Sequence, residues 1–326
     1  MIEIKDESFV FIGEQPCQTR YKQIKEGSFS LYFLSEHTNE KDSIYEVGKD
    51  YTIDFESGKI MLTQESRVPN FKNSVLYGKE DFDHRVAHQS NGSFTVYASY
   101  ESAEEKEPIR YNGFMMKNAV EKLKRTGEIN YLVFGDSIST GCEAFKGRAY
   151  FDLLKNYLEC EYGGKVNIVN VAVSGETTED GKKRLDKILE NDFDLVTIAY
   201  GTNDHCKKEN TVSDCFTSFT DYKNNIEQFI ISFRGKNPLV DIFLIAPFEV
   251  NRKWHFHSPS MPVFVEILKM LSKIHGTGLV DIFSSFEEEQ KNGKTAEDLF
   301  NNDINHPNNY GHILYFERIK KLFEGL

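Results

Sequence analysis

The sequence has few cysteines, and none of them forms a CxxC pair. Its five cysteines are scattered through 326 residues, at positions 17, 142, 160, 206 and 215. An odd number of isolated cysteines gives neither a disulfide framework nor the spacing of a zinc site or a redox motif. We therefore expect reduced thiols, as in a cytoplasmic protein, and neither a metal nor another cofactor.

Long hydrophobic runs and basic blocks are also absent. No stretch approaches the roughly 18 consecutive apolar residues of a membrane helix, and the first residues lack the pattern of a signal peptide. These absences predict a soluble protein that stays in the cytoplasm and does not bind membranes. The 39 basic and 51 acidic side chains give a net charge of −12. Such a charge balance, without a block of basic residues, gives no basic surface for nucleic acid. The sequence leaves the oligomeric state open.

The length of the chain favours two domains of roughly 150 residues each. Up to about residue 110, short apolar runs alternate with turn residues, which is typical of a small β-sandwich. The charged segment 102–108 is the predicted linker, so the expected domains are 1–110 and 111–326. The predicted N-terminal strands are Ser28–Phe33, Tyr51–Phe55, Lys59–Thr63, Ser74–Tyr77 and Phe94–Tyr100.

After residue 110 the hydrophobic period changes, and apolar runs alternate with amphipathic helical patterns. Strands that are apolar on both faces and separated by helices predict a parallel sheet covered by helices on each side. The second region is therefore expected to be an α/β domain with about five strands. These strands are Tyr131–Phe134, Val166–Val171, Asp194–Ala199, Asp241–Ala246 and Gly278–Ile282.

Small and polar residues follow these strands at the points where ligands bind in an open parallel sheet. The segments are GDSIS at 135–139, the glycine of VSG at 173–175, GTND at 201–204 and DINHP at 303–307. In this order, these blocks resemble the SGNH subgroup of the GDSL esterase and acylhydrolase family. The resemblance covers about residues 127–326, with Ile138 replacing the leucine of the family name. It implies a flavodoxin-like five-stranded sheet and an esterase that needs no cofactor.

The resemblance also implies a role for individual residues. Ser137 would be the nucleophile, His306 its base, and Asp303 the carboxylate that orients the imidazole. A serine hydroxyl needs such a base, because it is a weak nucleophile at its own pKa. The oxyanion of the reaction would be bound by the backbone N–H groups of Ser137 and Gly175 and by the side-chain amide of Asn203.

Each of these residues also has a purely structural interpretation. Ser137 alone suits a helix N-cap, His306 a hydrogen-bonded loop histidine, and Asp303 a turn residue. The complete, ordered set favours the catalytic interpretation. Asp136 and Asp204 are expected to stabilise their loops by hydrogen bonds.

The loop 248–259 follows the fourth strand on the same side of the sheet and holds the only tryptophan. Trp254, Arg252 and His255 are candidate substrate-binding residues, because aromatic and polar side chains commonly line pockets. The alternative is that Trp254 packs against the β domain. The HFH sequence at 255–257 has no further ligand nearby, so a metal site is not expected.

These observations predict a serine hydrolase that cleaves small acyl esters, with acetyl groups on a saccharide preferred. A thioesterase or acyltransferase would use the same residues, and a catalytically silent carbohydrate-binding protein is the alternative outside enzymology. A nucleotide-binding domain is disfavoured, because neither GxGxxG nor GxxxxGK[ST] follows the first strand. The N-terminal region resembles, in architecture alone, the β-sandwich that precedes some carbohydrate acetyl esterases. The alternative is a packing or oligomerisation domain whose edge covers part of the active-site cleft.

Overall fold

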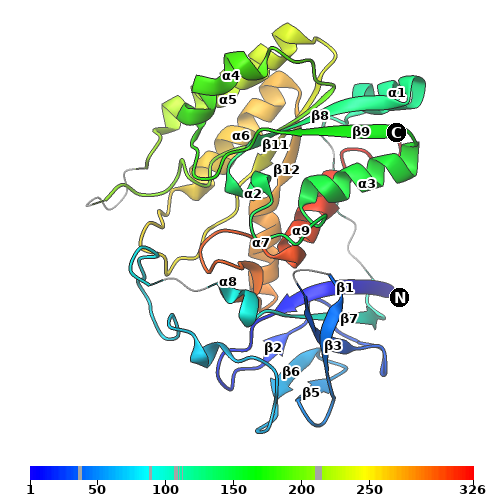
Figure 1. The fold of residues 1–326 in the computed structure, drawn as a ribbon, viewed down its shortest axis with the longest axis vertical. Coiled ribbons are helices and arrows are strands. Elements are labelled where there is room, and N and C mark those ends of the chain that lie inside the picture. The colour runs from blue at the N-terminus through cyan, green and yellow to red at the C-terminus, as the bar shows by residue number, and fades with distance from the viewer. Residues whose placement is uncertain (36–38, 88–89, 106–108, 110, 112, 210–214) are drawn as a thin grey trace.

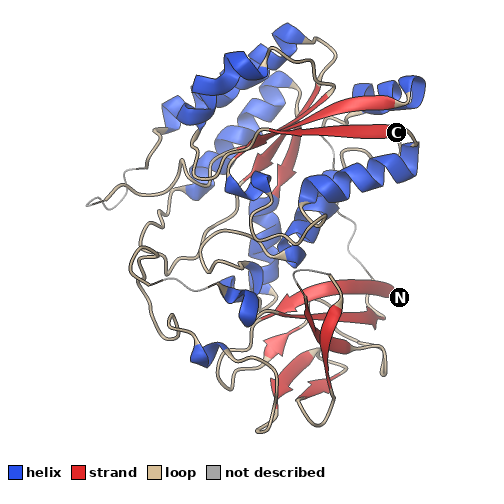
Figure 2. Cartoon of the chain, in the orientation of Figure 1, coloured by secondary structure: helices blue, strands red, loops and turns tan. Residues whose placement is uncertain are grey.

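The computed structural model describes residues 1–326 except 36–38, 88–89, 106–108, 110, 112 and 210–214. An N-terminal β region lies beside a larger α/β region, and the two are in contact (Figure 1, Figure 2). Part of the predicted linker and the predicted boundary at residue 110 lie outside the described residues. The division into 1–110 and 111–326 therefore stays a prediction.

The β region contains two antiparallel sheets, with the strand orders β1-β7-β3-β4 and β2-β6-β5. Apolar residues from both sheets, including Phe9, Leu31 and Ile60, pack in one buried cluster. This packing confirms the predicted sandwich-like β region. Its elements are β1 Ile2–Phe9, β2 Cys17–Gln18, β3 Ser30–Leu34, β4 Lys41–Tyr45, β5 Tyr51–Asp54, β6 Lys59–Leu62, η1 Phe71–Asn73, η2 Asn91–Ser93 and β7 Val96–Ser102.

Several elements of the β region differ from the prediction. Ser74–Tyr77 is a turn rather than a strand, because the Ser74 hydroxyl accepts the backbone N–H of Leu76 at 3.2 Å and stabilises a local turn. Strands β2 and β4 were not predicted, and neither was the first strand, β1. Its hydrophobic alternation is interrupted by a register shift between Ile4 and Glu7, and the Glu7 side chain is buried.

The α/β region is built on a parallel sheet in the order β12-β11-β10-β8-β9. Counted along the chain from β8, this is the flavodoxin-like order 2-1-3-4-5, which confirms the predicted fold. The strand order reverses between β8 and β10, and ligands bind at such a point in doubly wound sheets. The strands are β8 Glu128–Gly135, β9 Lys165–Asn170, β10 Leu195–Ala199, β11 Asp241–Ala246 and β12 Gly278–Asp281.

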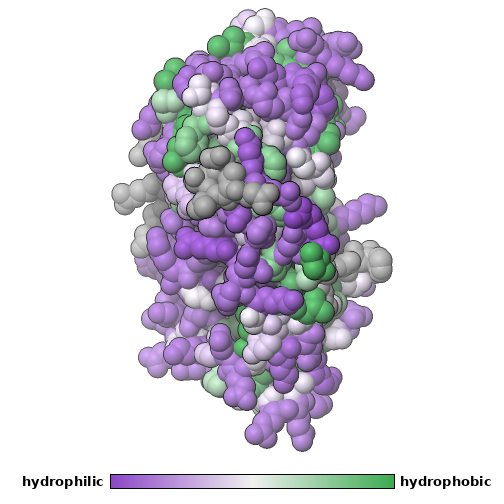
Figure 3. All heavy atoms as spheres, turned by 90° about the vertical axis from the view of Figure 1, so that its left-hand side faces the viewer, coloured by the Kyte–Doolittle hydropathy of each residue, from purple (hydrophilic) through white to green (hydrophobic). Residues whose placement is uncertain are grey.

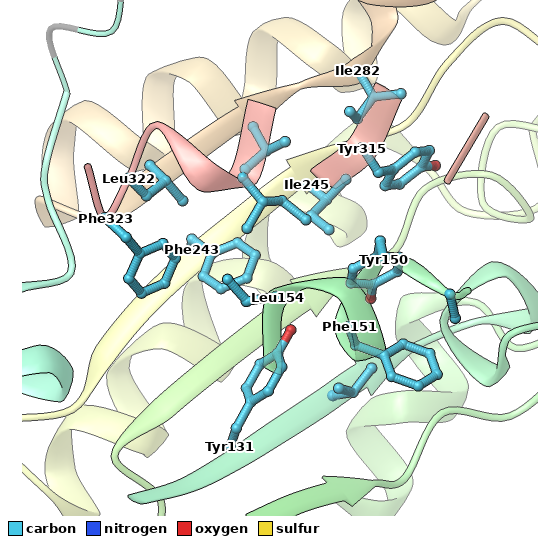
Figure 4. Packing of buried hydrophobic residues seen from close by; sticks show 14 of the residues in the cluster. Tyr131, Tyr150, Phe151, Leu154, Phe243, Ile245, Ile282, Tyr315, Leu322 and Phe323 are labelled. Atoms are coloured by element: carbon cyan, nitrogen blue, oxygen red, sulfur yellow. The ribbon is translucent and has the colours of Figure 1, made fainter. Parts of the chain in front are cut away.

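Helices cover both faces of this sheet (Figure 2). Residues of α1, α3, α7 and α9 share one buried cluster with Tyr131 and Val133 of β8, and residues of α4, α5 and α6 share the other with Leu132 and Phe134. Figure 4 shows the first cluster, where Tyr131 and Phe243 of the sheet lie close to helical side chains. The helices are α1 Lys117–Thr126, α2 Ser137–Thr140, α3 Tyr150–Tyr162, α4 Thr178–Ile188, α5 Phe219–Lys236, α6 Met261–His275, α7 Ile282–Lys291, α8 Ala296–Leu299 and α9 Asn309–Lys320.

In the described part of the chain, no helix combines the length and the hydropathy needed to cross a bilayer.

The β region is joined to the α/β region by a buried ion pair. Strand β1 packs against α8 and α9, and the Nζ of Lys294 lies 2.7 Å from Oε1 of Glu7, with side-chain exposures of 1% and 0%. The ammonium also donates to the Ser8 carbonyl at 2.7 Å, and Asp298 accepts the backbone N–H of Val10 at 2.6 Å. Because both charges are removed from water, each depends on the other for compensation.

Lys294→Met is expected to lower the free energy of unfolding by about 3–5 kcal/mol, because the Glu7 carboxylate would stay buried without its cation. Urea unfolding followed by circular dichroism measures this loss. The control is Lys5→Met, because Lys5 pairs with Glu3 at 3.2 Å on the exposed surface, where ion pairs contribute little. Equal effects of the two substitutions would contradict the importance of the buried pair.

Candidate active site

Ser137 lies at the turn between β8 and α2. The preceding Asp136 is the N-cap of α2, and its Oδ1 accepts the backbone N–H of Ile138 at 3.1 Å. Gly135 lets β8 pass close to β10, because a Cβ at this position would lie 2.5 Å from the Ala199 carbonyl oxygen. The sharp turn places Ser137 at the carboxyl edge of the sheet, and Asp136 has the structural role predicted for it.

His306 reaches Ser137 from a loop that is distant in the sequence. Its Nε2 lies 2.8 Å from the Ser137 Oγ, across 169 residues of chain. The Asn302 side chain shapes this loop: its Oδ1 accepts the backbone N–H groups of residues 304, 305 and 306 at 3.1, 2.9 and 2.8 Å. Pro307 bridges to Phe300 instead of opening the last helix, which begins at Asn309.

Asp303 lies on the same loop, in the left-handed region with φ of 61°. Its carboxylate is buried, and Oδ1 accepts a hydrogen bond of 2.6 Å from the side-chain amide of Asn91. Oδ2 has no hydrogen-bond partner among the described residues. Burial raises the pKa of Asp303 to about 7, although the bond from Asn91 favours the charged form.

Gly175 and Asn203 are brought together by the loops that follow β9 and β10. The Asn203 Nδ2 donates to the Glu176 carbonyl at 2.9 Å, and its second hydrogen remains for another acceptor. Asp204 accepts the backbone N–H of Thr178 at 3.0 Å, which ties the two loops. Gly175 has φ of 81° and open space at its Cβ position, so its backbone conformation is what requires glycine.

A cavity of about 680 Å³ adjoins these two residues. Trp254, a candidate substrate-binding residue, is among the residues that line it, and His84 and Arg85, which come from the N-terminal region, were not identified from the sequence. The separation of about 170 residues between His84 and Trp254 left no local pattern to find. The lining residues are His84, Arg85, Gly175, Thr177, Asp180, Asn203, Cys206, Glu209, Phe216, Trp254 and Phe256.

Trp254 has both of the positions considered for it. Its ring is buried in a cluster with Phe82 and Phe94 of the N-terminal region, and its edge reaches the cavity. The Trp254 Nε1 donates to Nδ1 of His84 at 3.1 Å. The tryptophan therefore holds the N-terminal segment at the cavity wall.

Arg252 and His255, the other two candidate substrate-binding residues, are not among the side chains that line this cavity. Arg252 is 74% exposed, and the His255 Nδ1 lies 3.2 Å from Asp81. Neighbouring positions on an irregular loop point in different directions, so adjacency to Trp254 did not bring them to the cavity. Within the described ranges, His, Cys, Asp and Glu side chains form no group of three suited to a metal ion.

A flavodoxin-like sheet with a serine and a histidine hydrogen-bonded at its carboxyl edge is the arrangement of a serine hydrolase. The model of the GDSL-like Lipase/Acylhydrolase family matches residues 133–314, and the chain belongs to this family. The match begins inside β8, so it leaves the β region outside the family model.

The individual proteins that this chain resembles match it over a short segment or at low identity. The chain is 39% identical over 74 residues to an arylesterase of Vibrio mimicus, a match that covers 22% of this chain and 36% of that protein. An acetylxylan esterase from Geobacillus stearothermophilus, Axe2, has a similar fold, with a TM-score of 0.51, 22% identity and coverage of 61% of this chain and 95% of that one. LAE5, an alpha/beta hydrolase enzyme from the metagenome of Lake Arreo, is similar with a TM-score of 0.50 and 22% identity. The match covers 60% of this chain and 94% of LAE5.

Asp136→Asn should flatten the dependence of stability on pH between about pH 4 and pH 7. Burial raises the pKa of Asp136 from 3.8 to about 7, so in this window the folded protein holds a proton that the unfolded chain has lost. The resulting stabilisation is full below pH 4 and is lost as the pH rises through 7. Asparagine keeps the acceptor for Ile138 but does not titrate.

Urea unfolding at pH 4.5 and 7.5 checks this expectation. Asp186→Asn, at an exposed position on α4, is the control that should keep the wild-type slope. An Asp136→Asn variant with the same slope as wild type would show that the buried carboxyl does not carry the effect.

Proposed function

We propose that this protein is a serine esterase that hydrolyses small acyl esters through an acyl-enzyme on Ser137. The observation that carries the proposal is the hydrogen bond of 2.8 Å between Ser137 Oγ and His306 Nε2. A serine becomes a useful nucleophile when a base of suitable pKa lies within hydrogen-bond distance. The position of Ser137 at the strand order reversal supports the same function, as does the large cavity that adjoins Gly175 and Asn203.

In the proposed reaction, His306 takes the proton of Ser137 as the Oγ attacks the ester carbonyl. The tetrahedral intermediate then collapses, and His306 returns the proton to the leaving alcohol. A water molecule, activated by the same imidazole, attacks the acyl-enzyme and releases the carboxylic acid. Ser137 and His306 end the cycle in their starting protonation states.

The negative charge that develops on the carbonyl oxygen needs donors that are already in place. We assign this role to the backbone N–H groups of Ser137 and Gly175 and to the free amide hydrogen of Asn203. The bond from Asn203 to Glu176 supports this assignment, because it fixes the side chain before substrate arrives.

We assign to Asp303 the stabilisation of the His306 imidazolium. The buried Oδ2, which has no hydrogen-bond partner among the described residues, supports this role, since it is an acceptor for the Nδ1–H that His306 carries while its Nε2 takes the proton of Ser137. Hydrogen bonds between catalytic groups are often long without substrate and shorten in the complex.

We further propose that the substrates are acetyl esters of a carbohydrate. The cavity combines the aromatic rings of Trp254, Phe256 and Phe216 with polar groups, a combination that suits a sugar ring and its hydroxyls. The structural similarity to an acetylxylan esterase supports the same class. Hydrophilic residues predominate on the face shown in Figure 3, which favours a dissolved polar ester over a lipid interface.

Ser137→Ala should abolish ester hydrolysis while leaving the fold intact, because it removes the nucleophile only. The measurement is turnover of p-nitrophenyl acetate, butyrate and octanoate, with EDTA present to exclude a contaminating metal-dependent esterase. Wild type should prefer acetate. Equal rates in wild type and variant would overturn the assignment of Ser137, and the lack of any turnover in wild type would overturn esterase activity on simple esters.

Asn203→Ala should lower kcat by about 10²–10³-fold with little change in KM, because the donor acts on the transition state. Steady-state kinetics with p-nitrophenyl acetate measure both constants. Phe216→Ala is the matched control, since it removes a half-exposed ring from the same cavity and should change KM more than kcat. A change confined to KM in Asn203→Ala would contradict the oxyanion role.

A further inference from the structure

One buried side chain of the N-terminal region reaches the carboxylate of the active-site loop. Asn91, in the short helix η2, is fully buried, and its Nδ2 donates to the Asp303 Oδ1 at 2.6 Å across 212 residues of sequence. The same Nδ2 donates to the Phe300 carbonyl at 3.0 Å. Because both amide hydrogens meet acceptors, the orientation of the Asn91 side chain is defined.

The backbone around Asn91 is fixed to the same loop. The Asn91 N–H donates to the Asn301 carbonyl at 2.6 Å, and the Ser90 hydroxyl donates to that carbonyl at 3.0 Å. On the opposite side, the Asn251 Nδ2 donates to the Asp303 carbonyl at 2.7 Å. The loop that carries Asp303 is therefore held between the N-terminal segment and the loop after β11.

The two carboxylate oxygens of Asp303 have different surroundings. Oδ1 is occupied by Asn91, and rotation of the carboxylate would break that bond. Oδ2 is buried and has no hydrogen-bond partner in the described part of the chain. We propose that Asn91 is a positioning residue for ester hydrolysis, which holds the Asp303 carboxylate so that Oδ2 serves His306. The inference rests on the proposed function, and it makes the N-terminal region part of the active site.

The charges around Asp303 determine how the loss of Asn91 would act. Burial raises the pKa of this carboxyl, the Asn91 bond lowers it, Glu297 raises it, and Lys253 lowers it. Lys253 and Glu297 form an ion pair of 3.2 Å, so they largely offset each other. His306 is the remaining titratable group on the loop. Without Asn91, Asp303 would stay protonated to a higher pH, and a neutral carboxyl stabilises an imidazolium poorly.

The test compares Asn91→Leu with Ser90→Ala by the pH dependence of kcat and KM. Leucine keeps the volume and backbone of Asn91 but has no donor. Ser90→Ala removes a bond to the same loop without touching the carboxylate. For Asn91→Leu we expect kcat at pH 7 to fall about tenfold and KM to stay within about twofold. The acid limb, the part of the profile in which kcat rises with pH, should move up by about one pH unit. At pH 9 part of the loss in kcat should remain, because the ionised carboxylate is no longer held in place by Asn91, and Ser90→Ala should keep the wild-type limb.

Asn91→Asp is the second variant, because it has the shape of asparagine and is tested if the leucine variant does not fold. It removes the donor and places a second carboxyl beside Asp303, so its acid limb should move at least as far. An unchanged limb in a folded, slower variant, or an equal loss in Ser90→Ala, would overturn the inference while the proposed function stands. Wild type that hydrolyses no ester would overturn the proposed function and the inference together.

Discussion

The docking of β1 through the buried Glu7 and Lys294 pair is the interaction on which the rest of the arrangement depends. Neither charge is stable in the interior alone, so the two regions of the chain stabilise each other. Strand β1 packs against α8 and α9 and pairs with β7. The short helix η2, which precedes β7 in the chain, reaches the loop of Asp303 and His306 through Asn91. The position of the loop thus depends on parts of the chain that lie far from the reacting groups.

The sheet contributes the other half of the site by simple geometry. Parallel strands place all their carboxyl ends at one edge, and the reversal of order between β8 and β10 opens a crevice there. Ser137 follows β8 and Asn203 follows β10, so both residues, 66 positions apart in the sequence, lie at this edge of the sheet. A change in the other loops at this edge would therefore leave the position of Ser137 at the end of β8 unchanged.

The features of the fold and of the site that depend on a local sequence pattern could be predicted. Strands such as Asp241–Ala246 are apolar on both faces, and the blocks at Ser137, Gly175 and Asn203 follow strand ends, so the parallel sheet and its polar edge could be predicted. Contacts between distant segments could not. Strand β1 was hidden by its bulge and its buried Glu7, and nothing near Asn91 or His84 indicates a place in the site. Arg252 shows that proximity in the sequence is not enough, because its side chain is exposed to solvent although Trp254, two positions further on, lines the cavity.

The bond between Asn91 and Asp303 also has a consequence for how the protein is made. The ribosome adds roughly 5–20 residues per second, so the 212 residues between the two partners take on the order of 10–40 s to synthesise. During this interval the N-terminal sheets exist without Lys294 beside Glu7 and without the loop that Asn91 binds. The segment from Lys294 to Asp303 thus completes two incomplete surfaces at once, long after the N-terminal sheets have been synthesised.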